Sequence, residues 1–413
     1  MPNSSRITRV LGLGLFLALS CPLQATNYYI DSELGSNFNS GTSPWEAWKS
    51  PFRVRFKEFE PGDKLFLRSG DRWTGTLKIS GEGEAEFPIE VSAYGEENRP
   101  WIGGLDVEGE YILVQDLIID ADQDNRDAVR IEHSKHITLR RLEIRNGKAD
   151  GIDIQNSQDI LLSELLIHHF LAGSFENQLD AHGVGASNTQ RLTIEFTEIH
   201  HTSGDSLQVD ADRNAEKMSN DIIIRDSHFW TSPLEKDFNS GWRATAHKSA
   251  EERQYPGENA IDTKVVKENW EAAPRMRLTI DNLRAHGWRA DAYIANKAIF
   301  NLKEKIDATL NNIEVFDCEI AFRLRGKKGD PFIRIHNSKI YDCKVGIRAE
   351  DGLEDLTVTH TFFGEGLKMS INEVGKNTRR ATKGWTFTNN LFHKKVPVRQ
   401  RNDSNRSLRD LRN

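Results

Sequence analysis

The chain has 413 residues, of which 37% are apolar and 28% are charged, values typical of a soluble globular protein. Lysine and arginine total 55 against 62 aspartate and glutamate residues, which gives a formal charge of −7. This acidic balance argues against a long nucleic-acid-binding surface. After the N-terminus no segment reaches the roughly 18 uncharged apolar residues of a membrane span, so membrane insertion is not expected.

Residues 1–25 have the pattern of a secretory signal peptide. Arg6 and Arg9 form its basic start, residues 10–20 its apolar run, and Leu23-Gln24-Ala25 a small-residue cleavage site. The residues before Cys21 fit a lipoprotein signal poorly, so we expect ordinary cleavage and a secreted or periplasmic protein. Removal of the two arginines leaves 53 basic against 62 acidic side chains, a formal charge of −9.

Residues 26–105 read as short strands separated by tight turns. Pro61-Gly62-Asp63 and Ser69-Gly70-Asp71 are turn signals between short apolar runs. The aromatic residues of this part suggest a plug over the end of a larger structure: Trp45, Trp48, Phe52 and Trp73. We therefore expect an N-terminal cap followed by the first coils. A small separate β-domain is the alternative.

The middle of the chain repeats a strand-like pattern with apolar residues at alternate positions. The repeats begin at residues 112, 137, 160, 192, 222, 278, 310, 333, 356 and 385. Several intervals are 23 or 25 residues, and the longer ones fit a coil plus an inserted loop. A β-rich repeat of this period is typical of a solenoid whose coils share one core. We therefore predict an all-β, single-stranded right-handed parallel β-helix over residues 106–395, followed by a polar tail at 396–413 that is expected to be disordered.

Two cysteines remain after signal cleavage, 25 residues apart. Cys318 and Cys343 occupy the same place in neighbouring coils, so they are predicted to stack one rung apart, about 4.8 Å between strands. A buried ladder of free cysteines is preferred over a disulfide, which an oxidising compartment would permit.

Each repeat carries a second strand whose outward positions are polar. One column of such positions contains Asp150, His182, Asp205 and Asn259, and a second contains Asp153, Gln208, Asp262 and Arg323. Lys264 and Arg325 lie one step further along their strands. The segment 291–296 fits this series less cleanly, and its register is not determined by sequence. Polar ladders that satisfy turn amides are the alternative explanation for these columns.

Two insertions border the strand that contains Lys264. The segments 231–256 and 265–277 carry several aromatic and cationic residues, a composition that suits an anionic sugar chain. Uronate polymers are cleaved by β-elimination, in which a cation neutralises the carboxylate and a base removes the C5 proton. Lys264 is the predicted base if neighbouring cations or burial lower its pKa. The alternative is an exposed strand lysine paired with Asp262.

The N-terminal residues resemble the cap of secreted parallel β-helix proteins, many of which are polysaccharide lyases. The pattern is Tyr28-Tyr29-Ile30-Asp31, Gly41-Thr42-Ser43-Pro44, Pro61-Gly62-Asp63 and Gly70-Asp71-Arg72-Trp73. The segment from Gly257 to Lys264 is similar to the catalytic strand of the chondroitinase B and alginate lyase family. That resemblance implies a lysine base, a uronate substrate with alginate favoured, and a Ca²⁺ ion.

The resemblance also implies roles for individual residues. The calcium ligands would be Asp205, Asn259 and Asp262, although Asn259 and Gly257 stand where the family has glutamates. The Arg-His-Gly signature of the family is replaced by Ala295-Asn296-Lys297. The acid that assists the leaving group therefore has three candidates: Lys297, Tyr293 and Arg325.

The expected ligand is an acidic polysaccharide bound by a monomer. The residues predicted to contact it are His182, Asp205, Gln208, Arg289, Arg323, Tyr255 and Trp242. Two other functions fit the same fold. A glycoside hydrolase of polygalacturonase type would use Asp180, Asp205 and Asp262, and a non-catalytic solenoid would bind carbohydrate without cleaving it.

Overall fold

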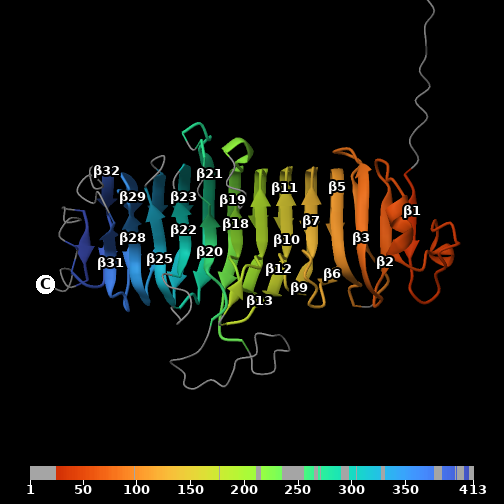
Figure 1. Cartoon of the computed structure of the whole chain (residues 1–413), viewed down its shortest axis with the longest axis horizontal. Helices are drawn as coiled ribbons and strands as arrows, with labels where there is room; N and C mark the ends of the chain where they lie inside the picture. The colour runs from red at the N-terminus through yellow and green to blue at the C-terminus, as the bar shows by residue number, and fades with distance from the viewer. Residues whose placement is uncertain are drawn as a thin grey trace, which may run out of the picture.

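The protein is a parallel β-solenoid with almost no helix (Figure 1). The computed structural model describes residues 25–96, 98–175, 177–210, 215–234, 255–264, 268–269, 271–289, 297–303, 305–326, 331–375, 384–395, 397 and 404–408. The predicted signal peptide at 1–25 lies almost entirely outside these residues. Within them, no helix is both long and apolar enough to cross a membrane.

Three parallel sheets run along the solenoid. The first sheet consists of β3 (Arg72–Glu82), β5 (Trp101–Gln115), β7 (Val129–Glu132), β10 (Ile152–Gln155), β15 (Val184–Ser187), β18 (Leu207–Val209), β20 (Asn259–Thr263), β22 (Ala298–Lys303), β25 (Cys318–Arg325), β28 (Cys343–Glu350) and β31 (Met369–Val374). Its middle strands lie side by side along the long axis in Figure 1.

The second and third sheets complete each coil. The second contains β1 (Asn27–Ile30), β2 (Lys64–Arg68), β4 (Ile89–Tyr94), part of β5, β8 (Lys135–Arg140), β11 (Gln158–Ser163), β16 (Gln190–Glu195), β19 (Asn220–Trp230), β21 (Met276–His286), β23 (Ile306–Asn311), β26 (Phe332–His336), β29 (Asp355–Thr359) and β32 (Gly384–Thr388). The third contains β6 (Ile118–Asp120), β9 (Glu143–Gly147), β12 (Leu166–Phe170), β17 (Glu198–Thr202), the ends of β19 and β21, β24 (Glu314–Phe316), β27 (Lys339–Ile340), β30 (Phe362–Phe363), β33 (Leu391–Phe392) and β34 (Arg406–Ser407).

A few short elements lie outside the coils. They are the 3₁₀ helices η1 (Pro44–Glu46), η2 (Pro51–Phe56) and η3 (Ala215–Lys217), and an antiparallel pair formed by β13 (Ala172–Gly173) and β14 (Gln178–Leu179).

One continuous apolar core fills the solenoid. The inward positions of successive strands stack, as in the column Ile137, Ile160 and Leu192, and these side chains are at most 1% exposed. Aromatic residues follow the same rule, since Phe300 and Phe322 stack at 4.8 Å between ring centroids. Burial of these stacked apolar side chains is the main stabilising term for such a fold.

The predicted repeat register is confirmed for most coils and wrong for one. Ile112 pairs with Ile137, and Ile222 pairs with Leu278, as the repeat predicts. Leu278, however, pairs with Ala308 rather than Leu310. A shift of two residues leaves the same side chains facing the core because strand side chains alternate.

The aromatic plug is only partly formed. Trp48 and Trp73 are buried in the core, whereas Trp45 is 88% and Phe52 56% exposed. The exposed pair lies on η1 and η2, whose short 3₁₀ turns direct these rings toward solvent.

The stacking predicted for the two cysteines is present. Cys318 on β25 pairs with Cys343 on β28, and both are buried free thiols. The two sulfur atoms lie 2.7 Å apart, so the predicted stacking places them in direct contact.

A ladder of stacked rings runs along the third sheet. His168 and His200 stack at 4.9 Å, and His200 lies 4.4 Å from Trp230, measured between ring centroids. The ladder continues through His286 and Phe316, which stack at 4.5 Å. Burial, followed by the repulsion of neighbouring histidines, lowers the pKa of His200 to about 2 and that of His286 to about 4. These imidazoles are neutral at pH 7.

The ladder should make stability depend on pH. An unfolded histidine has a pKa near 6.5, so below about pH 6.5 the unfolded chain binds protons that the folded ladder does not accept. The free energy of unfolding is therefore expected to fall between about pH 6.5 and pH 4. His286→Phe keeps the ring stack but removes one titrating group, so urea unfolding should show a shallower pH dependence. His133→Asn, at an exposed histidine, serves as control. Equal slopes for His286→Phe and the unsubstituted protein would contradict this explanation.

Candidate functional site

The two predicted polar columns lie on the outer face of the first sheet. The strand register places Gly185 beside Gln208, Gln208 beside Asp262, and Asp262 beside Asn301. Asn301 in turn pairs with Arg323 on β25. The other column lies three residues earlier in each coil: Asp150, His182 and Asp205 precede β10, β15 and β18, and Asn259 is the first residue of β20. Polar side chains from successive coils therefore form one continuous surface.

Asp205 is the most buried acid of this surface. Its carboxylate accepts hydrogen bonds from Gln208 Nε2 at 3.0 Å and from Asn259 Nδ2 at 2.7 Å. Its backbone N–H donates to His182 Nδ1 at 2.8 Å, which fixes the imidazole proton on Nε2. Burial raises the pKa of Asp205, and the neighbouring charge of Asp262 raises it further.

His182 continues this ladder toward the N-terminus. Its backbone N–H donates to Asp150 Oδ1 at 2.7 Å. The polar ladder weighed as an alternative is thus real for Asp150, His182 and Asp205. It orients the imidazole and the buried carboxylate on adjacent rungs.

A buried carboxylate shared by two lysines lies on the next rungs. Asp262 Oδ2 is 2.7 Å from Lys264 Nζ, and Asp262 Oδ1 is 2.6 Å from Lys303 Nζ. Both lysine side chains are only 12% exposed, and that of Asp262 is 2% exposed. Lys264 is therefore paired with Asp262, as the alternative interpretation stated, but it is largely buried rather than an exposed surface residue.

The two lysines differ in their pKa. For Lys264, burial favours the neutral form, but the charges of Asp262 and Asp205 outweigh it and raise the pKa. For Lys303, burial dominates and lowers the pKa. A lysine with a lowered pKa next to a second cation has the properties of an activated base. The lowered pKa expected for Lys264 is therefore found, in direction, for Lys303 instead.

Glu258 is a half-buried acid immediately before β20. Burial, together with the charges of Asp205 and Asp180, raises its pKa to about 7. Lys264 and Asp262 also influence this pKa, so Glu258 belongs to the same electrostatic cluster. A carboxyl group with such a pKa is about half protonated at pH 7 and can act as a general acid.

Arginines follow the lysine pair on the C-terminal coils. Arg323 Nε donates to Glu350 Oε1 at 3.0 Å, and Arg348 Nε lies 2.6 Å from the same oxygen. Arg325, which pairs with Lys303 in the strand register, lies 3.6 Å from Glu350 Oε2. Three guanidinium groups thus share one carboxylate, and this end of the surface is cationic.

The other predicted site residues lie elsewhere or outside the described residues. Lys297 is 1% exposed and donates to the Tyr255 carbonyl oxygen at 2.7 Å. Arg289 binds Asp317, and Asp342 at 2.9 Å, on turns of the following coils. Trp242 and Tyr293 are not among the described residues.

The predicted calcium ligands do not form a suitable donor set. The Asp205 carboxylate accepts hydrogen bonds from two side-chain amides, and the Asp262 carboxylate is paired with two lysines, although its Oδ1 atom has no hydrogen bond of good geometry. A calcium site requires six to eight oxygen ligands around the ion. Among the residues that the structure describes, no group of three or more histidine, cysteine or acidic side chains is arranged to hold a metal ion.

Sequence reasoning missed Asn301, Lys303 and Glu258. The rung after β20 is β22, whereas the segment 291–296 considered for this series lies outside the described residues. The spacing that could have identified it is a polar residue followed two positions later by a cation, which occurs as Asp262 with Lys264 and as Asn301 with Lys303.

Comparisons with known proteins agree with the fold. A family model described as "right handed beta helix region" matches residues 104–231. A lacto-N-biosidase of Bifidobacterium longum subsp. longum is 32% identical over 138 residues, which span 31% of this chain and 9% of that protein.

Solved structures of similar fold act on different carbohydrates. A GH136 lacto-N-biosidase from Eubacterium ramulus superposes with a TM-score of 0.52 and 15% identity, covering 89% of this chain and 68% of that one. The pectate lyase Pel9A has a TM-score of 0.50 and 14% identity, covering 82% of this chain and 79% of that one. At these identities the likeness shows the fold alone, which is shared by hydrolases and lyases.

Removal of the shared carboxylate should destabilise the protein. Asp262→Ala leaves Lys264 and Lys303 as adjacent, largely buried cations without their partner, so we expect a loss of about 3 kcal/mol in the free energy of unfolding. Asp281→Ala, at an exposed acid on β21, should change it by less than about 0.5 kcal/mol. Urea unfolding at pH 7 measures both. Equal effects of the two substitutions would show that the lysine pair does not depend on Asp262.

Proposed function

We propose that the chain is a secreted or periplasmic polysaccharide lyase that acts as a monomer on a uronate-containing polysaccharide, with alginate favoured. The observation that carries this proposal is the pair of lysines on Asp262, one with a lowered pKa, followed on the next rungs by three arginines. This arrangement combines a base with cations for a substrate carboxylate.

The cations would neutralise the uronate carboxylate. Lys264 keeps a raised pKa and therefore its charge, and Arg325 lies beside Lys303 in the register. Guanidinium and ammonium groups that pair with the carboxylate neutralise its negative charge next to C5. The C5 proton becomes more acidic as a result, which lowers the barrier to its removal.

The elimination then needs one base and one acid. Lys303 Nζ, in its neutral form, removes the proton from C5, and the electron pair forms the C4–C5 double bond. The C4–O4 bond breaks at the same time, and O4 receives a proton from Glu258. Lys303 thus takes the role first assigned to Lys264, and Glu258 takes the role for which Lys297, Tyr293 and Arg325 were candidates.

Charge-conserving substitutions separate the two lysines. Lys303→Arg keeps a cation on Asp262 but cannot be deprotonated near neutral pH, so kcat should fall by roughly 10²- to 10⁴-fold while KM changes little. Lys264→Arg should keep kcat within about tenfold, because Lys264 acts as a cation. Absorbance of the unsaturated uronate product on alginate, pectate and chondroitin sulfate reports the rate. The opposite pattern would return the role of base to Lys264.

A glycoside hydrolase is the second candidate, and one observation favours it. Glu258 with a pKa of about 7 is a suitable general acid, and Asp205, Asp262 and Asp180 all lie close enough to influence that pKa. Hydrolysis would give new reducing ends without the ultraviolet absorbance of an unsaturated sugar. Reducing ends without that absorbance would contradict the lyase proposal and support a glycoside hydrolase.

Both mechanisms make the same prediction for Glu258. Its carboxyl group is protonated below about pH 7 and ionised above it, so kcat should decline as pH rises through 7. Glu258→Gln should lower kcat by roughly 10²-fold or more and remove that alkaline decline. Glu319→Gln, at an acid outside this cluster, is the control. An unchanged pH profile in Glu258→Gln would exclude this residue as the acid.

A further inference from the structure

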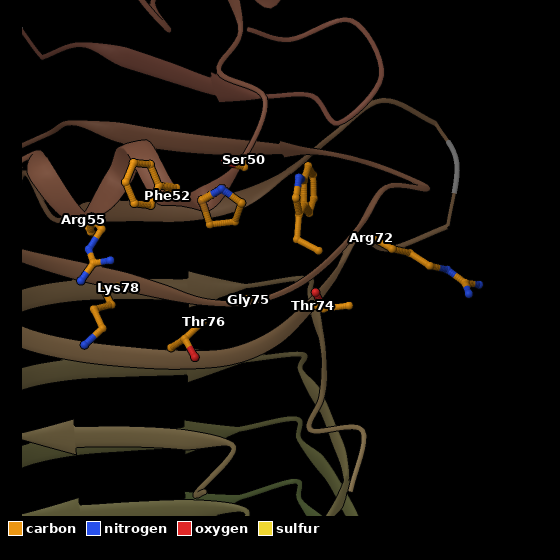
Figure 2. Close-up of a pocket in the computed structure, with 10 residues that line it drawn as sticks. Ser50, Phe52, Arg55, Arg72, Thr74, Gly75, Thr76 and Lys78 are labelled. Atoms are coloured by element: carbon orange, nitrogen blue, oxygen red, sulfur yellow. The ribbon is translucent and has the colours of Figure 1, made fainter. Parts of the chain in front are cut away.

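A pocket lies at the N-terminal end of the solenoid, far from the lysine pair. It has a volume of about 570 Å³ and is formed by η2 and the first half of β3 (Figure 2). Arg55 and Lys78 reach toward one end of it, and Arg72 extends at the opposite end. Phe52 borders the pocket and is 56% exposed.

The backbone of β3 leaves open space in this pocket. The register between β3 and β5 shifts between Trp73 and Thr76, which marks a β-bulge. Gly75 lies within this bulge, and a Cβ atom added there would meet no atom within 4 Å. The space above Gly75 is therefore available to a ligand or to a larger side chain.

The pocket combines exposed rings with cations. The Arg55 guanidinium lies 5.6 Å from the ring centroids of both Phe52 and Phe56, and Phe56 is 68% exposed. Lys78 pairs with Asp106 at 3.0 Å but remains about half exposed. Exposed aromatic rings beside guanidinium and ammonium groups suit the apolar face and the carboxylate of a uronate residue.

The pocket lies in line with the candidate catalytic site. The strand register carries Lys78 to Asp106, Asp106 to Arg130, and onward through four more rungs to Asp262. Gly75 precedes Lys78 by three residues, which is also the spacing between Asn259 and Asp262. Six rungs at about 4.8 Å place the pocket about 29 Å from the lysine pair along the solenoid axis.

We propose that this N-terminal pocket is a distal binding site for the acidic polysaccharide, where a uronate residue stacks on Phe52 and pairs with Arg55 and Lys78. This inference rests on the proposed function, because it assumes that one polymer chain binds both the N-terminal pocket and the catalytic site of the same molecule. A polymer held at the pocket raises its effective concentration at the catalytic site, whereas a trisaccharide is too short to reach both.

Three substitutions on this pocket and a matched control test the proposal. Gly75→Trp fills the open space, while Phe52→Ala and Arg55→Ala remove the ring and the cation. Arg53→Ala changes another exposed arginine of η2, one that does not line the pocket. In affinity electrophoresis through gels containing alginate or pectate, each pocket variant should bind the polymer about tenfold more weakly than the Arg53→Ala control. The ratio of KM for polymer to KM for trisaccharide should rise by a similar factor.

The outcomes distinguish the pocket from the proposed reaction. Weaker polymer binding in the pocket variants, combined with no cleavage of any polymer by the unsubstituted protein, would support the distal site and contradict the lyase function. Cleavage with polymer binding and KM ratios equal to those of Arg53→Ala would overturn the distal site and leave the lyase function in place. If Gly75→Trp fails to fold, Phe52→Ala and Arg55→Ala decide the question by the same measurements.

Discussion

Parallel pairing in a fixed register is the constraint on which this structure depends. Each strand of the first sheet aligns with the same positions of the next, so a residue type repeated at one position becomes a column. Apolar columns fill the core, and polar columns form the outer face. The outward positions can carry polar side chains because the apolar side chains at the inward positions provide the core packing.

The polar surface changes character along the axis. It is acidic around Asp150 and Asp205, mixed around Asp262, and cationic around Arg323 and Arg348. Asp262 lies at the boundary, where it holds two ammonium groups close together in a largely buried place. Such a pair is costly to bury, and its unequal pKa values give the neighbouring lysines different chemical properties. An anionic substrate would therefore have one preferred orientation along the solenoid.

Alternating apolar residues and the repeat period were enough to predict the fold and the two polar columns. The match between Leu278 and Ala308 was missed because a small alanine gives a weaker pattern than Leu310 two positions later. Lys303 was missed because residues 298–302 are almost entirely apolar, and Ala298 stands where the preceding rung has Asn259. Asn301 was the one polar residue among these five that marked the strand as part of the column.

The pairing of Lys264 could not be derived from its own segment. Its partner Asp262 also pairs with Lys303. Lys303 lies 39 residues after Lys264 in the sequence and contacts Asp262 only because the two coils stack. The pKa of Glu258 is set in the same way by burial and by acids from other coils. Sequence spacing predicts which residues share a face, but not how burial and neighbouring charges change their pKa values.

The position of the lysine pair within the stack has a consequence for local opening. Each rung contacts mainly its two neighbours, so unfolding of a solenoid spreads from its ends, one coil at a time. β18, β20 and β22 lie between coils on both sides, from β3 to β15 and from β25 to β31. Unfolding that begins at either end of the solenoid would have to open several coils before it reached Asp262. The candidate site around Asp262 is thus protected against local unfolding by the coils on either side of it.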